Sequence, residues 1–353
     1  MRIGLVRRGF SGTGGAEAYL LRLAGGLAAA GHEPCLLASP EWPAAAWPHG
    51  PVVRLPGGTP SAFASAFLQE KSNYDVTLSL DRTPGCDVFR AGDGVHAAWL
   101  QRRAAFEPSW KPFLRRWSPK HGALMLLERG VFRDAKLVIA NSQMVADEIV
   151  AWHSVDPSRL RVIPNGISAA LPGISKAVAR KTLGVPEDVF CLLFAGSGWE
   201  RKGLRFAVEA VRKLPDETLL LVAGRGRTGA LAGPRTRFLG PTRDLPAVFS
   251  AADAFVLPTI YDPFSNACLE ALAAGLPVLT TTANGFSEIV TDGVHGSVTP
   301  PGDVEALTRS IESWRSADRE ETAENCRKLA SHYSIERNVR ATILALEKAV
   351  AAR

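Results

Sequence analysis

The sequence contains no long apolar run and only scattered cysteines. None of its apolar stretches reaches the roughly 18 residues that a membrane-spanning helix needs. The first residues enter an apolar strand rather than a signal segment, so we expect a cytoplasmic protein. Five cysteines occur among 353 residues, and no two of them have the spacing of a metal-binding motif. We therefore expect reduced, mostly buried thiols and no disulfide framework.

The sequence also lacks internal repeats and metal-binding motifs. It has neither a carboxylate cluster suited to Mg²⁺ nor a His/Cys set suited to zinc, so we expect no metal and no cofactor. Hydrophobic residues make up 46% of the chain and charged residues 22%, which is ordinary for a soluble globular protein. A net charge of +6 favours an acidic partner, which leaves nucleic acid, anionic lipid and a phosphorylated glycan open.

Short apolar strands alternate with amphipathic helices along the chain. The pattern begins with a strand over 1–7 and a helix over 16–30, and it restarts with a strand over 190–195 and a helix over 202–213. Repeated units of this kind predict parallel sheets covered on both faces by helices, and hence an α/β fold. Two such series imply two Rossmann-like domains.

A turn-forming segment at 164–167 marks the expected boundary between these domains. We place an N-terminal domain over 1–168 and a C-terminal domain over 169–335. A last helix over 336–353 is expected to pack back on the N-terminal domain. In open α/β sheets ligands bind beyond the carboxyl ends of the strands, so the loops that follow strands are the places to seek a site.

One loop-and-helix segment carries the strongest signal. Asp262 stands in a loop, a Pro-Phe turn ending at Phe264 follows, and Ser265 opens a helix that bears Glu270 and stops at Gly275. The free N–H groups of a first helical turn favour an anion. Two carboxylates beside such a helix start suit a ligand with phosphates and hydroxyls, such as a nucleotide sugar. An amphipathic helix whose Glu270 merely faces water is an equally weighted alternative.

Two other loops bear groups that suit an anion. Gly14 and Gly15 lead into a helix, where glycine lets the backbone approach a ligand closely, although a flexible turn explains them as well. Arg201 and Lys202 stand at the start of a helix. Cations are unfavourable there unless a negative ligand compensates them, so a functional role is the favoured interpretation.

A third glycine-rich loop, over 84–96, contains Asp93 and His96. Either side chain could contact a hydroxyl or act as a base, although aspartate in such loops is most often a turn residue.

Basic residues alternate with tryptophan over 99–121. This composition suits an anionic membrane surface, and it could also bind nucleic acid or form a solvated basic helix whose tryptophans pack inward. With His96, the expected acceptor or membrane residues are Trp99, Arg102, Arg103, Trp110, Lys111, Arg115, Arg116 and Trp117.

Together these motifs resemble the family 4 glycosyltransferases, which are retaining, metal-independent and of the GT-B fold. The resemblance rests on the two acids of segment 262–270, on the Arg201-Lys202-Gly203 motif and on the interdomain segment 162–167. Segment 85–93 is similar to the lipopolysaccharide core glucosyltransferase branch. The resemblance implies two facing Rossmann-like domains, N-terminal for the acceptor and C-terminal for the nucleotide sugar, with a cleft between them.

The resemblance also implies a role for each matched residue. Glu270 is expected on the donor ribose and Asp262 on the sugar hydroxyls, while Arg201 and Lys202 contact the diphosphate and Asp93 lies near the reacting groups. The catalytic set is thus Asp93, Arg201, Lys202 and Asp262. The donor-binding set is Gly14, Gly15, Ser197, Leu239, Gly240, Phe264, Ser265, Asn266 and Glu270.

Two departures from the family pattern fall in the sugar pocket. Asp262 replaces the usual glutamate and Ser265 a glycine, so the identity of the sugar stays open. The expected reaction moves a hexose, glucose first, from a UDP-sugar to a lipopolysaccharide core or related glycolipid. We expect a peripheral protein on the inner face of the inner membrane that does not bind nucleic acid.

Three alternatives remain at this stage. The chain could be a transferase for a soluble acceptor, a nucleotide-sugar epimerase, or a non-enzymatic module that binds a sugar nucleotide or nucleic acid.

Overall fold

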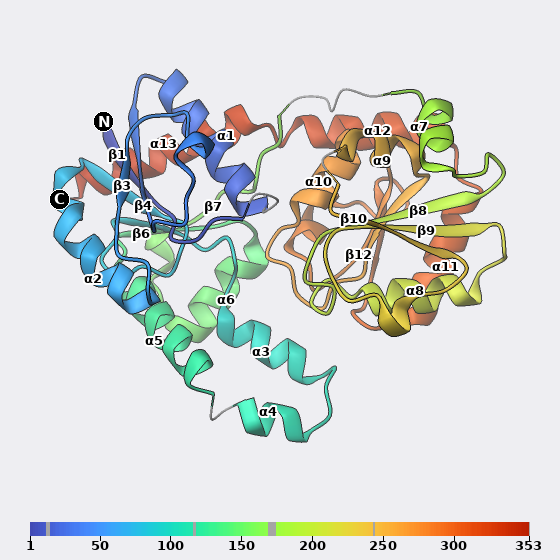
Figure 1. The fold of residues 1–353 in the computed structure, drawn as a ribbon, viewed down its shortest axis with the longest axis horizontal. Coiled ribbons are helices and arrows are strands. Elements are labelled where there is room, and N and C mark those ends of the chain that lie inside the picture. The colour runs from blue at the N-terminus through green and yellow to red at the C-terminus, as the bar shows by residue number, and fades with distance from the viewer. Residues whose placement is uncertain (12–14, 116–117, 169–173, 243, 353) are drawn as a thin grey trace. The chain divides into compact units, whose positions relative to one another are not determined.

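The structure, a computed structural model, describes residues 1–11, 15–115, 118–168, 174–242 and 244–352. The chain divides into two compact units (Figure 1). Unit 1 comprises 1–166 and 335–353, and unit 2 comprises 167–334. Each unit is built on one parallel sheet, so the α/β class predicted from the alternation of strands and helices is confirmed.

The described residues of unit 1 form a seven-stranded parallel sheet in the order β3-β2-β1-β4-β5-β6-β7. Its central strands are apolar and fully buried at positions such as Ile3, Leu36 and Leu78, because helices cover the sheet. The strand bounds are β1 (Arg2–Val6), β2 (Glu33–Ala38), β3 (Val52–Arg54), β4 (Val76–Ser79), β5 (Val88–Arg90), β6 (Leu137–Ala140) and β7 (Leu160–Val162).

One correction to the sequence analysis concerns the glycine-rich loop over 84–96. Its residues Val88–Arg90 form strand β5, which pairs with β4 and β6. A three-residue strand is too short to show a periodic pattern, and the flanking glycines obscured it.

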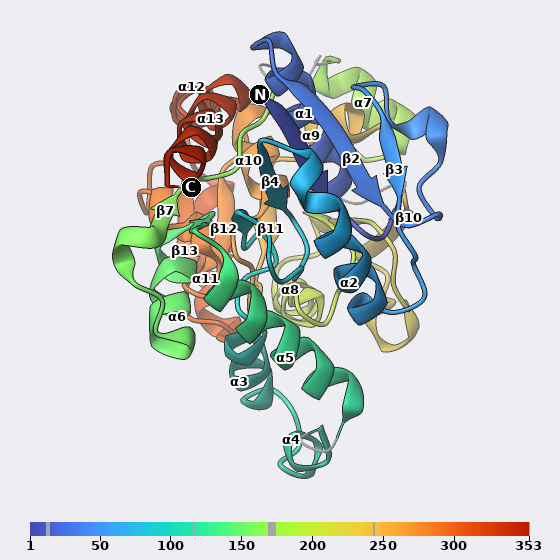
Figure 2. The ribbon, with the colours of Figure 1, turned by 90° about the vertical axis from the view of Figure 1, so that its left-hand side faces the viewer.

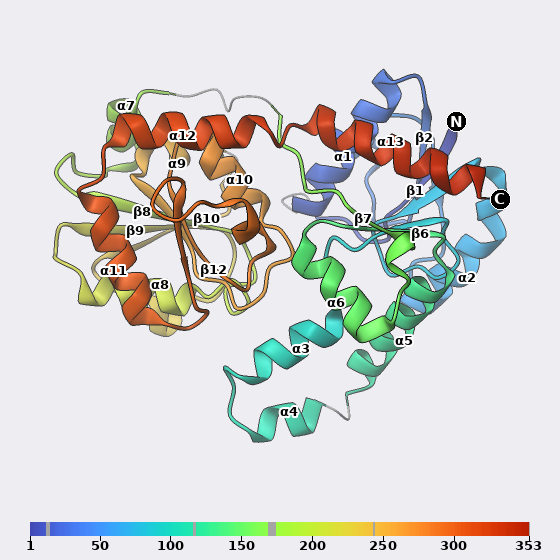
Figure 3. The same ribbon diagram turned by 180° about the vertical axis from the view of Figure 1, so that it is seen from behind.

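The helices of unit 1 include the chain's last one. Their bounds are α1 (Gly15–Ala29), α2 (Pro60–Glu70), α3 (His96–Ala104), α4 (Trp110–Arg115), α5 (Pro119–Asp134), α6 (Gln143–His153) and α13 (Ile335–Ala351). Helix α13 lies alongside α1, as Figure 3 shows. Helices α3 and α4 extend away from the sheet of their unit (Figure 2). None of the described helices is both long enough and apolar enough to cross a bilayer.

Unit 2 has a six-stranded parallel sheet in the order β10-β9-β8-β11-β12-β13. Its strands are β8 (Phe190–Ala195), β9 (Thr218–Ala223), β10 (Thr236–Gly240), β11 (Ala254–Leu257), β12 (Val278–Thr281) and β13 (Gly296–Thr299). Its helices are α7 (Lys176–Leu183), α8 (Leu204–Lys213), α9 (Leu245–Ala251), α10 (Asn266–Ala273), α11 (Val304–Arg315) and α12 (Arg319–Ser331). The strand order reverses between β8 and β11, and the crevice outside the carboxyl ends at such a point is where ligands bind.

The packing of α13 on α1 depends on a glycine. A Cβ added at Gly26 would lie 2.4 Å from a methyl group of Val339. In an unhindered helix Gly→Ala stabilises by roughly 1 kcal/mol, but overpacking costs about 1–3 kcal/mol. We therefore predict that Gly26→Ala lowers the free energy of unfolding, measured by urea denaturation.

Two further variants control for this effect. Gly26→Ala with Val339→Ala should recover part of the loss, because the double variant removes the clashing methyl groups. Gly122→Ala should be neutral or stabilising, since nothing lies within 4 Å of the added carbon in α5. If the changes in unfolding free energy of Gly26→Ala and Val339→Ala simply add in the double variant, the proposed contact is contradicted.

Candidate active site

Three charged side chains predicted as catalytic come together at the point of unit 2 where the strand order reverses. Lys202 Nζ lies 3.0 Å from Asp262 Oδ2, and Arg201 Nη1 lies 3.7 Å from the same oxygen. Arg201 Nη1 also donates to the carbonyl oxygen of Tyr261 at 3.1 Å. The loop after β8 supplies both cations and the loop after β11 supplies the acid, so two strand ends build one charged cluster.

Backbone contacts hold these two loops together. Gly203 has a φ of +72°, and a Cβ there would lie 1.9 Å from the carbonyl oxygen of Pro258, so only glycine fits. The N–H of Ile260 donates to the carbonyl oxygen of Arg201 at 2.9 Å. The hydroxyl of Thr259 donates to that same oxygen at 2.8 Å. Thr259 is fully buried and positions Arg201, a role that the sequence analysis missed because no motif marks it.

Asp262 is only 5% exposed and is charged at neutral pH. Burial alone would raise the pKa of its carboxyl group, but the nearby charges of Lys202 and Arg201 hold that pKa below its usual value. The backbone N–H of Phe264 also donates to this carboxylate and lowers its pKa further. The amide of Phe264, predicted to face the donor, thus binds Asp262 in this structure.

The rest of the predicted segment forms the start of α10. Ser265 is the N-cap residue, and its hydroxyl accepts from the N–H of Cys268 at 3.4 Å. Asn266 is the first residue of the helix, and Glu270 lies one turn further on and is half-buried. The ring of Phe264 packs edge-on against Phe286, with centroids 5.6 Å apart. Helix α10 therefore presents its first turn at the same edge of the sheet as the charged cluster.

Asn284 is a second residue that the sequence analysis missed. It is fully buried, its side-chain oxygen accepts from the N–H of Phe286, and its amide donates to Thr280. Its backbone lies beside that of Asp262 in an isolated bridge. Asn284 thus fixes the turn that carries the acid.

Three more of the residues predicted to bind the donor lie at the carboxyl ends of the neighbouring strands. Leu239 and Gly240 end β10, and the carbonyl oxygen of Gly240 accepts from the N–H of Gly224 at 2.8 Å. The hydroxyl of Ser197, which follows β8, accepts from the N–H of Arg225 at 3.3 Å. These contacts bring the ends of β8, β9 and β10 to one edge of the sheet. Their roles toward a ligand stay predictions.

In unit 1, Asp93 and His96 occupy the loop between β5 and the start of α3. The side chain of Asp93 is 63% exposed, and its carboxylate lies 4.0 Å from Arg82 Nη1. His96 is half-buried, and its Nε2 lies 3.0 Å from Nδ1 of His121. Gly15 begins α1, whereas Gly14 lies outside the described residues.

A buried carboxylate orders this loop, and the sequence analysis missed it as well. Glu128, which is fully buried in α5, accepts from Arg82 Nε at 2.7 Å and from the backbone N–H of His96 at 2.8 Å. His153 Nε2 lies 3.2 Å from its other oxygen. Burial would raise the pKa of Glu128, but His153 and Arg82 together hold it below its usual value. The sequence did hold one indication that Glu128 is buried, because its neighbours Leu126, Leu127 and Val131 are apolar.

Most of the described basic and aromatic residues over 99–121 lie on α3, α4 and the start of α5. Arg102 pairs with Glu148 at 2.7 Å, and Arg103 pairs with Glu107 at 2.9 Å and lies over the ring of Trp99. Three of the nine residues predicted as acceptor or membrane contacts, Trp99, Arg102 and Arg103, therefore already have partners within the protein.

Helix α4 differs, because its aromatic side chains face outward. Trp110 is 58% exposed, with Lys111 Nζ over its ring, and Phe113 is also exposed. The interpretation in which the tryptophans pack inward does not hold for Trp110. The side chain of Arg115, and the residues Arg116 and Trp117, lie outside the part of the chain that the structure describes.

All five cysteines are buried and free. Among the residues that the structure describes, no group of three or more His, Cys, Asp or Glu side chains could hold a metal ion.

Two family models match the chain. "Glycosyltransferase Family 4" matches residues 13–171, and "Glycosyl transferases group 1" matches residues 190–316. "Lipopolysaccharide glucosyltransferase WaaG" of Escherichia coli K12 is 29% identical over 245 residues, which are 64% of this chain and 63% of that protein. "D-inositol 3-phosphate glycosyltransferase" of Mycobacterium sp. (strain KMS) is 30% identical over 214 residues, or 56% of this chain and 48% of that protein.

Solved structures agree with these matches. The crystal structure of WaaG, a glycosyltransferase involved in lipopolysaccharide biosynthesis, has a TM-score of 0.81 at 24% identity and covers 96% of this chain and 98% of that one. Anabaena HepE in complex with UDP-glucose has a TM-score of 0.76 at 20% identity, over 98% of this chain and 100% of that one.

The two sheets and their likeness to these solved structures define the GT-B fold. The chain belongs to the family 4 glycosyltransferases. It spans about half to just under two thirds of the length of the curated relatives it matches.

The lowered pKa of Asp262 predicts a pH dependence of stability. The pKa of Asp262 is lower in the folded than in the unfolded state, so its charge stabilises the fold. This stabilisation is complete at pH values above the unfolded-state pKa, which is about 4, and it is lost as the pH falls through the folded-state pKa. Asp262→Asn removes one partner of a buried ion pair, which costs about 3 kcal/mol at pH 7.

Urea unfolding of both proteins between pH 7 and pH 3 measures this difference. The gap in unfolding free energy between wild type and Asp262→Asn should narrow toward pH 3. A gap that stays constant would contradict the assignment of the lowered pKa to Asp262.

Proposed function

We propose that this protein is a retaining glycosyltransferase that moves a hexose, glucose in the first instance, from UDP-glucose to a lipopolysaccharide core or related glycolipid. The observation that carries the proposal is the Arg201–Lys202–Asp262 cluster at the strand reversal of unit 2. The name of the relative WaaG supports the reaction, and the UDP-glucose bound to HepE supports the donor.

The chemical task of such an enzyme is to stabilise a leaving nucleoside diphosphate. Negative charge builds on the β-phosphate as the sugar leaves, and preorganised cations offset it without reorganisation. Lys202 and Arg201 supply these cations, and Asp262 with the Tyr261 carbonyl holds them in place before the donor arrives. In this scheme the cations do the work of a metal ion, and the donor phosphate takes the proton of the acceptor hydroxyl.

We assign the other donor contacts to residues at the carboxyl ends of the strands of unit 2. We assign Glu270 to the ribose hydroxyls, because it lies on α10 beyond the N-cap residue Ser265. The ends of β8 and β10, with Ser197 and Gly240, take the diphosphate and the base. We assign unit 2 to the donor and unit 1 to the acceptor, and within unit 1 we assign the exposed carboxylate of Asp93 to the acceptor.

Replacing Lys202 tests the leaving-group role. We predict that Lys202→Ala lowers kcat by well over tenfold, because it removes a charge that acts on the departing diphosphate. UDP release from UDP-glucose with a lipopolysaccharide acceptor measures the rate, and far-UV circular dichroism checks the fold.

Lys213→Ala is the matched control. Lys213 is a lysine of the neighbouring helix α8 whose exposed ion pair with Glu305 has no part in the site, so its rate should stay at the wild-type value. Near-wild-type turnover of Lys202→Ala would overturn the assignment. Silence of the wild-type protein with every nucleotide sugar would favour a binding module instead.

A glycolipid acceptor requires contact with a membrane, and α4 supplies the candidate surface. Trp110 and Phe113 of α4 are exposed, and Lys111 Nζ lies over the ring of Trp110. Aromatic side chains beside cations suit the interface of an anionic bilayer. We assign the protein to the inner face of the inner membrane, held peripherally by this surface. A soluble phosphorylated acceptor is the second candidate, supported by the name of the inositol-phosphate relative.

Liposome co-sedimentation distinguishes the two acceptors. We predict stronger binding to vesicles with anionic lipid than to neutral vesicles, and a loss of several-fold in Trp110→Ser with Phe113→Ser, because these rings enter the interface. Trp152→Ser, which changes an exposed tryptophan of α6, is the control and should bind as wild type does. Equal weak binding to both vesicles would remove the membrane assignment.

A further inference from the structure

Unit 2 has a cavity at the edge of its sheet opposite the charged cluster. Its volume is about 470 Å³, within the usual range of small-molecule pockets. Phe190 at the start of β8, Asp253 before β11 and Pro277 before β12 line it, so it lies at the amino ends of the strands. The cavity is therefore separate from the loops that we assign to the donor.

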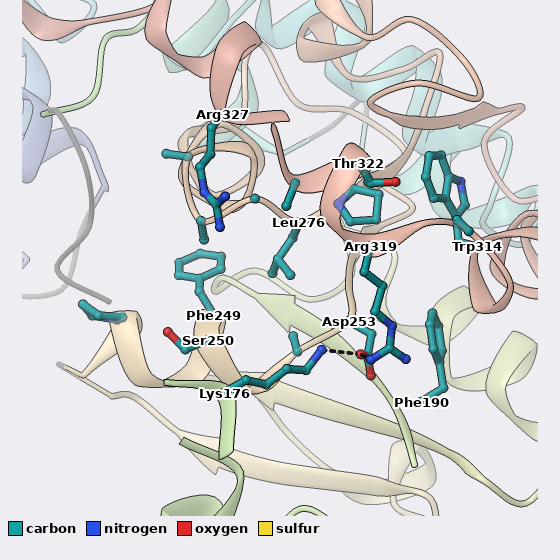
Figure 4. A pocket seen from close by; sticks show the side chains of 18 of the residues that line it. Lys176, Phe190, Phe249, Ser250, Asp253, Leu276, Trp314, Arg319, Thr322 and Arg327 are labelled. Atoms are coloured by element: carbon teal, nitrogen blue, oxygen red, sulfur yellow. Dashed lines mark hydrogen bonds and ion pairs between the residues drawn. The ribbon is translucent and has the colours of Figure 1, made fainter. Parts of the chain in front are cut away.

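The cavity contains more positive than negative charge. The side chain of Asp253 is 1% exposed, and its carboxylate lies 2.5 Å from Lys176 Nζ, 2.5 Å from Arg180 Nη2 and 3.1 Å from Arg319 Nη1. Figure 4 shows Lys176 and Arg319 reaching Asp253 from different sides of the cavity. One carboxylate thus faces three cations, and two positive charges are left without compensation there.

Stability does not account for Arg319. Lys176 and the buried Arg180 already neutralise Asp253, and the side chain of Arg319 is 62% exposed. An ion pair that is this exposed contributes little to folding. Arg319 is therefore available to a ligand that enters the cavity.

Arg327 adds a further charge to the wall. Its guanidinium points into the cavity toward Phe249 in Figure 4, and no carboxylate of the described residues forms an ion pair with it. A Cβ at Gly275 would lie 2.9 Å from Arg327 Nη2, so the glycine leaves room for this side chain. Together with Arg319, it gives the cavity two guanidinium groups suited to a phosphate or carboxylate.

Apolar side chains line the space between these cations. In Figure 4 Leu276 stands between Arg327 and Arg319, the ring of Phe249 lies below Arg327, and Trp314 and Phe190 lie on the right, beyond Arg319. A ligand that fits must pair an anionic group with a flat apolar body.

We propose that this cavity is a second binding site of the protein, for a small organic anion that carries a ring. The ring packs on Phe249 and Leu276, and a phosphate or carboxylate pairs with one of the two guanidinium groups, Arg319 or Arg327. Helix α10 connects this cavity to the donor edge, because it begins after Ser265 and its last residue, Ala273, lines the cavity.

Isothermal titration calorimetry with three ring probes tests the proposal. We use 1-naphthyl phosphate, 1-naphthoate and the neutral 1-naphthol, on the full chain and on Lys202→Ala. The expected result is one anion bound per chain, at least tenfold more tightly than naphthol, with equal affinity in Lys202→Ala. The stronger of the two anions shows whether the natural ligand is a phosphate or a carboxylate. Anion affinity no better than that of naphthol would overturn the proposal.

Substitutions then place the bound anion. Arg319→Gln with Arg327→Gln should weaken anion binding at least tenfold, whereas Lys328→Gln, next along α12 and outside the cavity wall, should not change it. Ala323→Phe, which fills the cavity, should abolish binding while thermal unfolding stays near wild type. Binding that survives both the double substitution and Ala323→Phe would overturn the assignment. Loss of catalysis in Lys202→Ala has no bearing on this result, so the two proposals fail independently.

Discussion

The ion pair between Lys202 and Asp262 is the contact on which the site depends. It joins the loops after β8 and β11, where the strand order of unit 2 reverses. Burying an aspartate removes its hydration, which is unfavourable unless nearby cations offset the loss. Asp262 therefore depends on Lys202 and Arg201, and both cations are held in place by Asp262. The two loops can approach this closely because residue 203 is glycine, since a Cβ there would collide with the carbonyl oxygen of Pro258. The cations are thereby aimed before any ligand arrives.

Unit 1 uses a related arrangement at its own strand reversal, between β1 and β4. Arg7, which follows β1, pairs with Asp81 after β4 at 2.9 Å and with Glu17 on α1 at 3.0 Å. The N–H of Arg8 donates to the same aspartate at 2.6 Å. Both units therefore use a cation after the first strand and an acid after the fourth to join the loops where ligands bind in this fold class.

Sequence reasoning reached those parts of the molecule that carry local signals. Long apolar strands and the Arg201-Lys202 motif were visible because their residue types are unusual in their positions. The strand β5 was not visible, because three residues are too few to show the alternating pattern of a strand. Thr259 and Glu128 were missed because each acts through a partner distant in sequence. The anion cavity draws its wall from residues between 174 and 327, so only folding brings it together.

The central claim is that unit 2 binds a UDP-sugar at the cluster around Asp262. A thermal-shift titration with UDP-glucose, GDP-glucose and ADP-glucose tests it most directly, because a bound ligand raises the unfolding temperature by mass action. The account predicts a concentration-dependent rise in Tm with UDP-glucose that is larger than with the other two. No rise with any of the three nucleotide sugars would contradict it.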